Sequence, residues 1–275
     1  MQSTVIRTLS HEFAIACPDP IASAAMAFVR AAPDMPERVL AAARISLARL
    51  GAFYSMRTAN GALFEGSLSH IVHRLHRFLF ETILHEAAGA PILHAATVVV
   101  EGARIILVAQ KAVGKSTLTA RLLAEGFVIE GDEHVVVFGR SVIARPRTMR
   151  IKQGTIGLIP ALREIILASP TIRDWDGRLI YSVQPALPGR RWRIEQGNVK
   201  AIVTLEQNHG GHSIMTRLDQ NEALRLAISM SFLPETGKAM AAARLRALIQ
   251  GASCYRLALG DLDNAVWHLK QAAYN

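Results

Sequence analysis

The sequence predicts an α/β fold, and three patterns support this. From Pro91 onward, short apolar segments rich in β-branched residues alternate with segments of helical periodicity, and glycines separate many of them. One such strand, Arg104–Val108, is followed by a short loop and then by a helical segment at Leu118–Ala124. The first 90 residues mix hairpin and helix patterns, which indicates a smaller α+β region. We therefore expect two parts, residues 1–90 and residues 91–275.

Composition limits the class of protein. Hydrophobic residues make up 51% of the 275 positions and charged residues 19%, which is typical of a folded chain. A formal net charge of +9 could favour nucleic acid or an acidic partner. The arginines are scattered and aromatic residues amount to only 6%, so we expect a basic protein whose excess charge serves phosphates and an acidic substrate, with no nucleic acid as partner.

Cysteine usage and hydropathy predict a cytoplasmic protein without a membrane segment. Cys17 and Cys254 are far apart and match no metal or redox spacing, so buried thiols in a reducing compartment are the simplest interpretation. The N-terminus lacks a basic start followed by an apolar core, and therefore predicts no signal peptide. No apolar run reaches the roughly 18 residues of a transmembrane helix.

The first part is expected to contain both strands and helices. Its segments are strands within 1–20 (best at Glu12–Ala16), a turn at Asp19-Pro20, helices at Ile21–Ala31 and Glu37–Ala43, antiparallel strands at 46–54 and 57–64 around an Asn60-Gly61 turn, and a long helix at about 68–88. The long helix carries His70, His73, His76 and His85. Their spacing could suit a metal, but without a carboxylate or cysteine in register a solvated or partner-facing helix is favoured.

The second part is expected to alternate between strand and helix. The predicted strands are 92–100, 104–108, 127–130, 135–138, 142–145, 200–205 and 253–259. The predicted helices are 157–168, 222–232, 238–250 and 263–273, and residues 170–198 form loops with short strands. Asn208–His212 is interpreted as a hairpin loop. The basic loop Gly189–Arg193 could touch an acidic peptide, although a solvated loop is favoured.

The loop between strand and helix follows the pattern Gly-x4-Gly-Lys-Ser/Thr, with alanine in the first position. In such a loop, backbone N–H groups and the helix N-terminus bind phosphate oxygens. Lys115 would reach the β- and γ-phosphates, and the Ser116 hydroxyl would bind Mg2+, so ATP and Mg2+ are the expected ligands. Alanine at 109 loses access to positive φ and fills space near the phosphates. The expected nucleotide-binding residues are Ala109, Gln110, Lys111, Ala112, Val113, Gly114, Lys115, Ser116 and Thr117.

Two adjacent carboxylates, Asp132 and Glu133, follow the strand after the loop's helix. Ligands of α/β sheets lie at the carboxyl ends of strands, and successive strand residues point to opposite faces. One acid could therefore accept the substrate proton while the other helps to hold Mg2+; a surface turn is the alternative. Lys152, after the basic run 145–150, could place positive charge over the phosphates or belong to a solvated basic face. His94 precedes the loop's strand and is taken alone as a core histidine.

Three stretches together resemble the HPr kinase/phosphorylase superfamily: Leu93-His94-Ala95-Ala96, the loop region Ile106–Leu118, and Gly126–Glu133. Later stretches look like the HPr kinase-related proteins of bacterial peptide biosynthetic clusters, which include kinases of lasso-peptide precursors. The resemblance covers roughly 91–262. It implies a P-loop kinase core of the HPr kinase C-terminal type and an ATP-dependent serine/threonine kinase. The implied roles are Asp132 as base, Lys115 and His94 in catalysis, and Ser116 with Glu133 at the Mg2+ site.

The resemblance also implies partners. Kinases of this kind suggest a homo-oligomer, and residues 1–90 would be a substrate or oligomerisation module. The sequence contains no Glu-Ile-Arg-Gly signature, which argues against HPr itself as substrate. A peptide or protein hydroxyl is therefore the leading acceptor. A small metabolite such as free serine, or a regulator that binds nucleotide without catalysis, are the alternatives.

Overall fold

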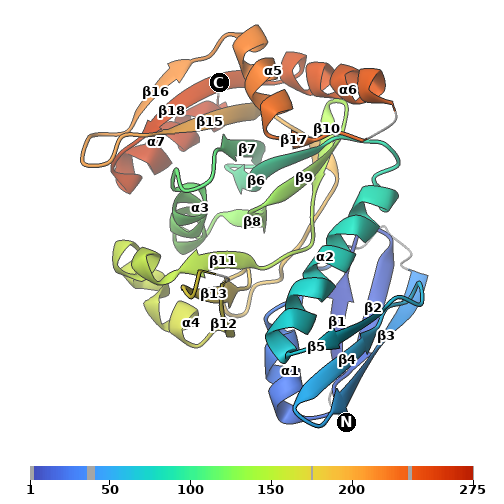
Figure 1. Cartoon of the computed structure of the whole chain (residues 1–275). Coiled ribbons are helices and arrows are strands. Elements are labelled where there is room, and N and C mark those ends of the chain that lie inside the picture. The colour runs from blue at the N-terminus through green and yellow to red at the C-terminus, as the bar shows by residue number, and fades with distance from the viewer. Residues whose placement is uncertain (1–2, 36–40, 175, 235–236, 275) are drawn as a thin grey trace.

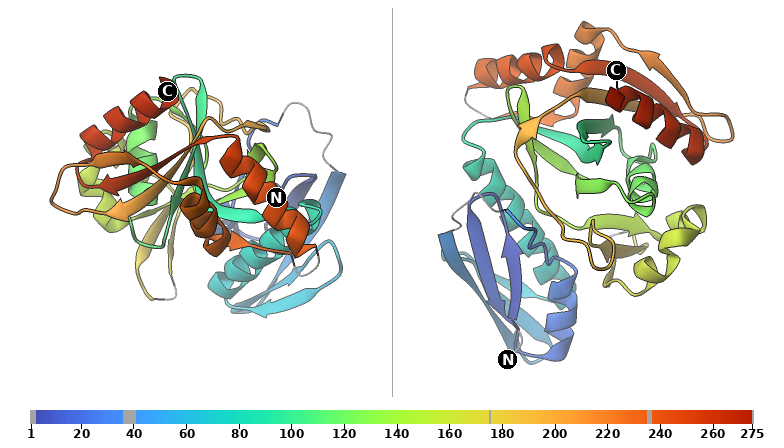
Figure 2. Two further views of the ribbon diagram at one scale, coloured as in Figure 1. Left: turned by 90° about the horizontal axis from the view of Figure 1, so that it is seen from above. Right: turned by 180° about the vertical axis from the view of Figure 1, so that it is seen from behind.

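The computed structural model describes residues 3–35, 41–174, 176–234 and 237–274, and these residues form a mixed α/β fold with three sheets (Figure 1). One sheet and two helices lie within residues 3–86, and the other two sheets follow in the chain. The first sheet lies at the opposite end of the molecule from α5 and α6 (Figure 2). The α/β expectation is confirmed at this level.

The first sheet has five strands in the order of the chain, and only β2 and β3 run parallel. The strands are β1 (Ser3–Arg7), β2 (His11–Ala16), β3 (Ala41–Leu50), β4 (Phe53–Arg57) and β5 (Leu63–Gly66). Helices α1 (Pro20–Ala27) and α2 (Leu68–Glu86) cover one face. Alternate strand residues such as Phe13, Ile15 and Ile45 pack against the apolar stripes of these helices.

Predictions for this part are wrong where pairing with a distant strand determines the secondary structure. The helix expected over Glu37–Ala43 is wrong for residues 41–43, which begin β3 and pair with β2, and residues 36–40 lie outside the described part of the chain. The pairing with β2 overrides the helix preference of the alanines. Helix α1 ends at Ala27 rather than Ala31. The Asn60-Gly61 turn is confirmed between β4 and β5, whereas the expected strand 46–54 contains the β3–β4 turn at Gly51.

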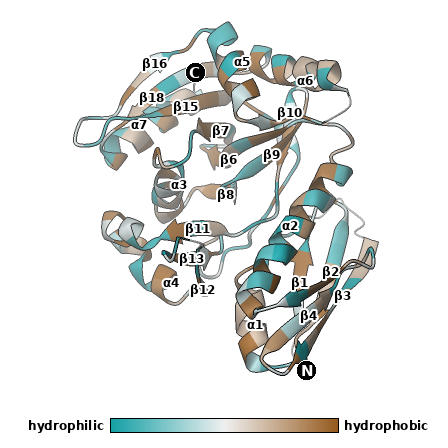
Figure 3. Ribbon diagram, in the orientation of Figure 1, coloured by the Kyte–Doolittle hydropathy of each residue, from teal (hydrophilic) through white to brown (hydrophobic). Residues whose placement is uncertain are grey.

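The central sheet has ten strands among the described residues, with the main order β14-β10-β9-β6-β7-β15-β18-β16. Its strands are β6 (Ile92–Val100), β7 (Ala103–Ala109), β8 (Val128–Gly131), β9 (His134–Phe138), β10 (Ser141–Ala144), β14 (Gly197–Asn198), β15 (Ala201–Gln207), β16 (Ile214–Arg217), β17 (Ser231–Phe232) and β18 (Ser253–Leu259). The central strands β6 and β7 are predominantly hydrophobic (Figure 3). Such runs are typical of strands buried on both faces.

Helices cover both faces of the central sheet. They are α3 (Lys115–Ala124), α5 (Gln220–Ser229), α6 (Lys238–Gln250) and α7 (Leu262–Tyr274). Ile105 and Leu107 of β7 share a core with α3 and α7, whereas Ile106 and Val108 share a core with α5 and α6. This alternation is the expected period of two for a buried strand. Both predicted helices at 238–250 and 263–273 are confirmed, the first with the same bounds.

A small third sheet completes the fold. It has the order β11-β13-β12, with β11 (Met149–Lys152), β12 (Thr171–Arg173) and β13 (Leu179–Val183). The segment 153–167 forms two 3-10 turns, η1 (Gln153–Leu158) and η2 (Pro160–Leu162), and the short helix α4 (Arg163–Leu167). Neither β11 nor β16 is predicted from the sequence.

The third sheet packs against the first part of the chain. The Ser182 hydroxyl donates to the Phe28 carbonyl at 2.7 Å, and Ile180 lies within the core of the first sheet. The Asp34 N–H also donates to the Trp192 carbonyl at 2.8 Å. A functional division at residue 90 therefore stays a prediction. No helix among the described residues is both long enough and apolar enough to span a bilayer.

One buried carboxylate joins the end of α2 to the β1–β2 turn. Glu86 is 5% exposed and accepts from the Leu9 and Ser10 N–H groups at 2.8 and 3.1 Å, from the Thr8 hydroxyl at 2.6 Å, and pairs with the His11 ring at 2.7 Å. Its removal would take away the charged acceptor that these groups share.

We expect Glu86→Ala to lower the free energy of unfolding by about 2–3 kcal/mol, because backbone donors lose a charged acceptor. Urea denaturation measures this loss. The matched control is Glu81→Ala, on the same helix, whose ion pair with Arg77 is exposed and should be worth less than about 0.5 kcal/mol. Equal losses in the two variants would contradict the assigned role of Glu86.

Candidate functional site

The loop between β7 and α3 ends in an uncapped helix N-terminus. Gly114 precedes the helix with φ of 110°, and no side chain caps the first turn of α3. A Cβ at Gly114 would lie 2.9 Å from the end of the flexible Leu259 side chain, so it is the left-handed conformation, rather than space, that favours glycine here. The uncapped N–H groups at this terminus are suited to anionic oxygens. The expected strand–loop–helix arrangement is confirmed.

Ala109 does not have the disadvantage expected from the sequence. It is the last residue of β7, pairs with Leu205 of β15 and is 2% exposed. Among the described non-glycine residues, φ is positive only at Ala88, Glu101 and Ala112, so Ala109 needs no left-handed conformation. Its side chain belongs to the core shared with α3 rather than to the cavity described below. The expectation that alanine here fills space beside the loop is therefore wrong.

Sheet topology brings Lys115 and Asp132 together. Strand β6 runs antiparallel to both β7 and β8, so β7 and β8 point the same way and their carboxyl ends meet at one edge. The Lys115 ammonium donates to the Asp132 carbonyl and lies 3.3 Å from its carboxylate. Both residues are buried, at 7% and 6% exposure. His94 lies at the same edge, because it stands near the start of β6.

A cavity of about 280 Å³ opens at this edge. The loop side contributes Gln110, Lys111, Ala112, Gly114, Lys115, Ser116 and Thr117. The opposite side contributes His94, Asp132, Glu133, Arg147, Thr148, Arg150, Lys152 and Thr155. Of the residues predicted for the site, Ala109 and Val113 are absent from this lining, and both pack toward the core. The remaining predicted residues surround one cavity.

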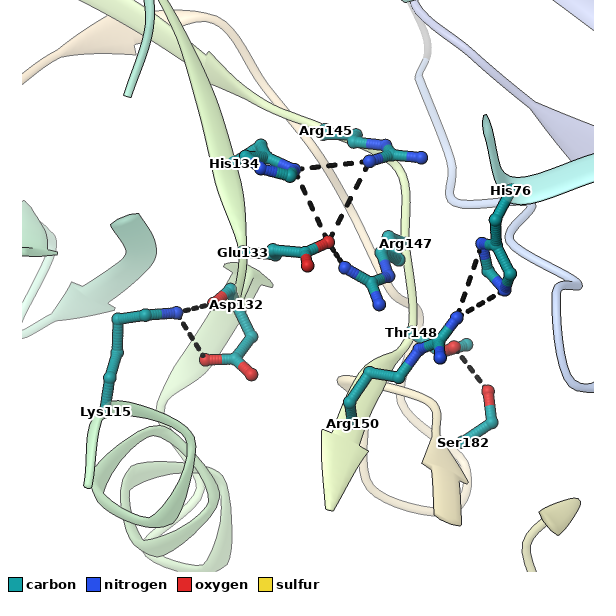
Figure 4. Close-up of polar contacts among 10 residues, drawn as sticks. All are labelled: His76, Lys115, Asp132, Glu133, His134, Arg145, Arg147, Thr148, Arg150 and Ser182. Carbon is teal, nitrogen blue, oxygen red and sulfur yellow. Dashed lines mark hydrogen bonds and ion pairs between the residues drawn. The ribbon is translucent and has the colours of Figure 1, made fainter. Parts of the chain in front are cut away.

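The two adjacent acids point in different directions (Figure 4). Asp132 faces Lys115, whereas the Glu133 carboxylate pairs with Arg147, lies 3.8 Å from Arg145 and lies 3.4 Å from the His134 ring. This divergence follows from the alternation of side chains at a strand end. It favours Asp132 for chemistry at the loop, and Glu133 for holding the arginines in place.

Metal ligands are few at this edge. No group of three or more His, Cys, Asp or Glu side chains that could hold a metal occurs among the described residues. Mg2+ commonly takes only one or two protein ligands and completes its shell with phosphate oxygens and water. The Ser116 hydroxyl and the Asp132 carboxylate are suited to serve as those one or two protein ligands. The histidines of α2 diverge: His70, His73 and His85 are exposed, whereas His76 contacts Arg150.

Burial and positive neighbours set the protonation of the site. Burial, with Lys115 and Arg147 nearby, lowers the pKa of His94 to about 4, so this ring is neutral near pH 7. Burial also lowers the pKa of Lys115, while the Asp132 carboxylate opposes that shift. The same burial lowers the pKa of Arg145 and of Arg150 to about 10. The cavity therefore has a neutral histidine and a positive wall.

Sequence reasoning missed Arg147, Thr148, Arg150 and Thr155, which line the cavity. A signal was available in the basic run. Met149 and Ile151 are buried, and the polar residues between and beside them alternate with the apolar ones, which is the pattern of a half-buried strand. Lys152, noted as a possible cation over the phosphates, also lines the cavity.

Two further loops differ from their predictions. Asn208–His212 joins β15 to β16, but β18 lies between those strands, so the segment is not a hairpin loop. In the loop Gly189–Arg193, Trp192 is 4% exposed and donates to the Glu130 carbonyl at 3.0 Å. Arg190 donates to the Gly126 carbonyl at 2.9 Å. This basic loop is thus anchored to the ends of β8 and α3 and does not line the cavity.

A second cavity of about 610 Å³ adjoins the first. Both share Gly114 and Thr117, and residues at and just after the ends of β18 and η1 also line the second, among them Leu259, Asp261 and Leu158. The loop therefore separates a charged cavity from a larger one with more apolar walls.

Comparisons with known proteins add little to this geometry. No family model matches the sequence, and no curated protein matches it. Among solved structures, the HPr(Ser) kinase/phosphatase from Coxiella burnetii is similar over 58% of this chain and 88% of that chain, with 11% identity and a TM-score of 0.24. A likeness of this size supports no argument about function, which must rest on the site itself.

Ala109, at the end of β7, and Ala112, in the loop that follows, lead to opposite predictions for stability. Ala112→Gly should raise the free energy of unfolding by about 0.5–1 kcal/mol, because it relieves a left-handed alanine with φ of 71°. Ala109→Gly restores the glycine of the motif, yet it should lower stability by about 1 kcal/mol, since it loosens a buried strand end. Urea denaturation separates these outcomes, and stabilisation by Ala109→Gly would contradict the account of this loop.

The lowered pKa of His94 predicts a dependence of stability on pH. The unfolded ring binds a proton near pH 6.5, while the folded ring does so only near its pKa of about 4. The contribution of His94 is therefore fully present above pH 6.5 and is lost as the pH falls toward 4. His94→Asn should lose less stability than the parent chain between about pH 7 and about pH 4.5. Identical losses, measured by urea denaturation at the two values, would refute this.

Proposed function

We propose that this chain is an ATP-dependent kinase, with a P-loop core of the HPr kinase type, that transfers phosphate to a serine or threonine hydroxyl of a peptide or protein. The observation that carries the proposal is the buried Lys115–Asp132 pair, formed between an uncapped loop–helix junction and the end of β8, the next strand along the chain. Phosphoryl transfer needs a phosphate cradle, a cation and a carboxylate in one place. The sequence resemblance to HPr kinase-like proteins supports the same reading.

The loop would bind the phosphates of ATP. The N–H groups at the start of α3 and the ammonium of Lys115 provide the positive face, and Ser116 would take part in holding Mg2+. Bound Mg2+ would neutralise charge on the phosphate oxygens. The second cavity shares Gly114 and Thr117 with the loop, and its size and apolar walls are suited to the nucleoside.

Asp132 is the proposed base. Its buried carboxylate lies beside Lys115 and lines the cavity, so an acceptor hydroxyl entering from the opposite side could transfer its proton to it. His94 is neutral near pH 7 and can accept or donate a hydrogen bond without adding charge. Glu133, which was expected to bind Mg2+, is proposed instead to hold Arg147 at the cavity.

The first 90 residues are proposed to help present the acceptor. Phe28 and His76, from this part of the chain, contact Arg150 at the cavity wall, which supports a role in substrate binding or assembly. A regulator without catalysis, the alternative function, would be favoured if alanine in the first motif position impaired the loop. Ala109 lies in the core of β7, so its side chain gives that alternative no support.

Phosphate transfer tests the proposal. The chain is incubated with γ-labelled ATP, Mg2+ and a randomised serine/threonine peptide library, with free serine in a parallel reaction. We expect label in the peptides, and we expect Asp132→Asn to reduce its rate by about 10²–10³-fold while ATP still binds, because the base acts only on the acceptor proton. Label in free serine alone would favour a metabolite kinase.

The matched control is Asp176→Asn, which removes a carboxylate paired with Arg178 outside the cavity and should leave the rate unchanged. Tight ATP binding with no transfer to any acceptor would make the chain a nucleotide-binding regulator. Equal rates in Asp132→Asn and the parent chain would reject Asp132 as the base.

A further inference from the structure

Strand β11 has one apolar and one polar face. Met149 and Ile151 are fully buried in the core beneath the central sheet. Arg150 and Lys152 alternate with them, so they share the other face, and both line the cavity beside the loop. Two cations are therefore held by a paired strand rather than by a free loop, which gives them fixed positions.

Arg150 lacks a close counter-ion among the described residues. Its Nη2 donates to the His76 ring, its guanidinium carbon lies 4.3 Å from the centroid of Phe28, and its Nε is buried without a hydrogen-bond partner. Asp174 raises the pKa of Arg150, but burial and the charge of Arg145 outweigh that effect. Arg147, in contrast, pairs with Glu133. A partly buried guanidinium with neutral contacts is costly unless a ligand supplies the anion.

The position of Arg150 assigns it to the acceptor side of the cavity. Figure 4 shows Lys115 and Asp132 at one end, Arg150 and His76 at the other, and Arg147 between them. Phosphates on the loop would lie at the Lys115 end. The Arg150 end instead adjoins the first part of the chain, through Phe28 and His76.

We propose that Arg150 and Lys152 bind an anionic group, a carboxylate or a phosphate, on the residue next to the acceptor hydroxyl of a peptide. The inference rests on the proposed kinase function and deepens it by naming the class of acceptor. The planar guanidinium of Arg150 can form two parallel hydrogen bonds to such a group, and Lys152, which is exposed at the cavity rim, adds a second charge. His76 is a positioning residue, because its ring holds the guanidinium.

The test compares peptides that differ only beside one serine. Aspartate, asparagine or phosphoserine flanks the acceptor, and the rates of ATP-dependent transfer are measured with the full chain. The acidic peptides should exceed the asparagine peptide about tenfold or more in kcat/KM, chiefly through KM, since an ion pair contributes to binding. The aspartate and phosphoserine arms identify which anion the site prefers.

Variants then connect this preference to β11. Arg150→Met and Lys152→Met should each bring the ratio of kcat/KM for the acidic and asparagine peptides close to one, with the KM for ATP changed less than about threefold. Arg150→Lys should restore part of this ratio. Arg163→Met is the control, because it removes an exposed arginine outside the cavity. Lys152 is exposed, so its variant tests the site even if Arg150→Met fails to fold.

A measurement of peptide binding distinguishes a failure of this inference from a failure of the proposed kinase function. The fluorescence anisotropy of labelled aspartate and asparagine peptides is measured with the full chain, ADP and Mg2+, which requires no transfer. Tighter binding of the aspartate peptide that Lys152→Met abolishes supports the subsite, even if no transfer is found. Equal binding of both peptides, or variants that raise only the KM for ATP, would overturn it.

Discussion

The buried ion pair between Lys115 and Asp132 is the contact on which the rest of the site depends. It connects the loop after β7 to the turn after β8, two strands that run the same way because β6 lies antiparallel to both. Removal of one partner from such a pair leaves an uncompensated buried charge, which typically costs about 3–5 kcal/mol. Burial of two charges itself costs several kcal/mol per ion in desolvation, so this pair does not lower the free energy of the fold as an apolar contact would. In the proposed phosphate transfer both would be used, with the ammonium directed at phosphates and the carboxylate at a proton.

A second polar network, centred on Glu133, lies between the two ends of the cavity. Glu133 directly follows Asp132, yet it points away from the loop and holds Arg147 and Arg145. The two acids at this strand end thus point in different directions, Asp132 toward Lys115 and Glu133 toward the basic segment before β11. Beyond that segment, Arg150 contacts Phe28 and His76 of the first part of the chain. The cavity therefore joins an end built by the central sheet and the loop to an end where both parts of the chain contribute.

Much of the central architecture could be predicted from the sequence. Helix α6 and strand β18 have the predicted bounds, and the strand, loop and helix around Lys115 are confirmed, because long periodic segments and glycine turns specify them locally. Lys115 and Asp132 could both be assigned to the site, because ligands of α/β sheets lie at the carboxyl ends of strands.

The rest depended on distant partners. Residues 41–43 became strand because β2 pairs with them, and β11 became strand because β13, some thirty residues later, pairs with it. The environment of Arg150 is made by His76 and Phe28, which no local pattern connects to it. The Ala109 position was misjudged for a related reason. Whether a motif position needs glycine depends on its φ, and at 109 the strand pairing with β15 determines the conformation.

Calorimetric titration with ATP and Mg2+ tests the central claim most directly, because it asks whether the loop and Lys115 bind phosphates at all. The account predicts that the parent chain binds ATP and that Lys115→Met weakens binding by at least about tenfold, whereas Lys270→Met, a change at a lysine on α7 that stacks on Phe127 outside the cavity, leaves it unchanged. Asp132→Asn should retain binding. Equal affinities in the parent chain and a folded Lys115→Met variant, or no binding by the parent chain, would contradict the account.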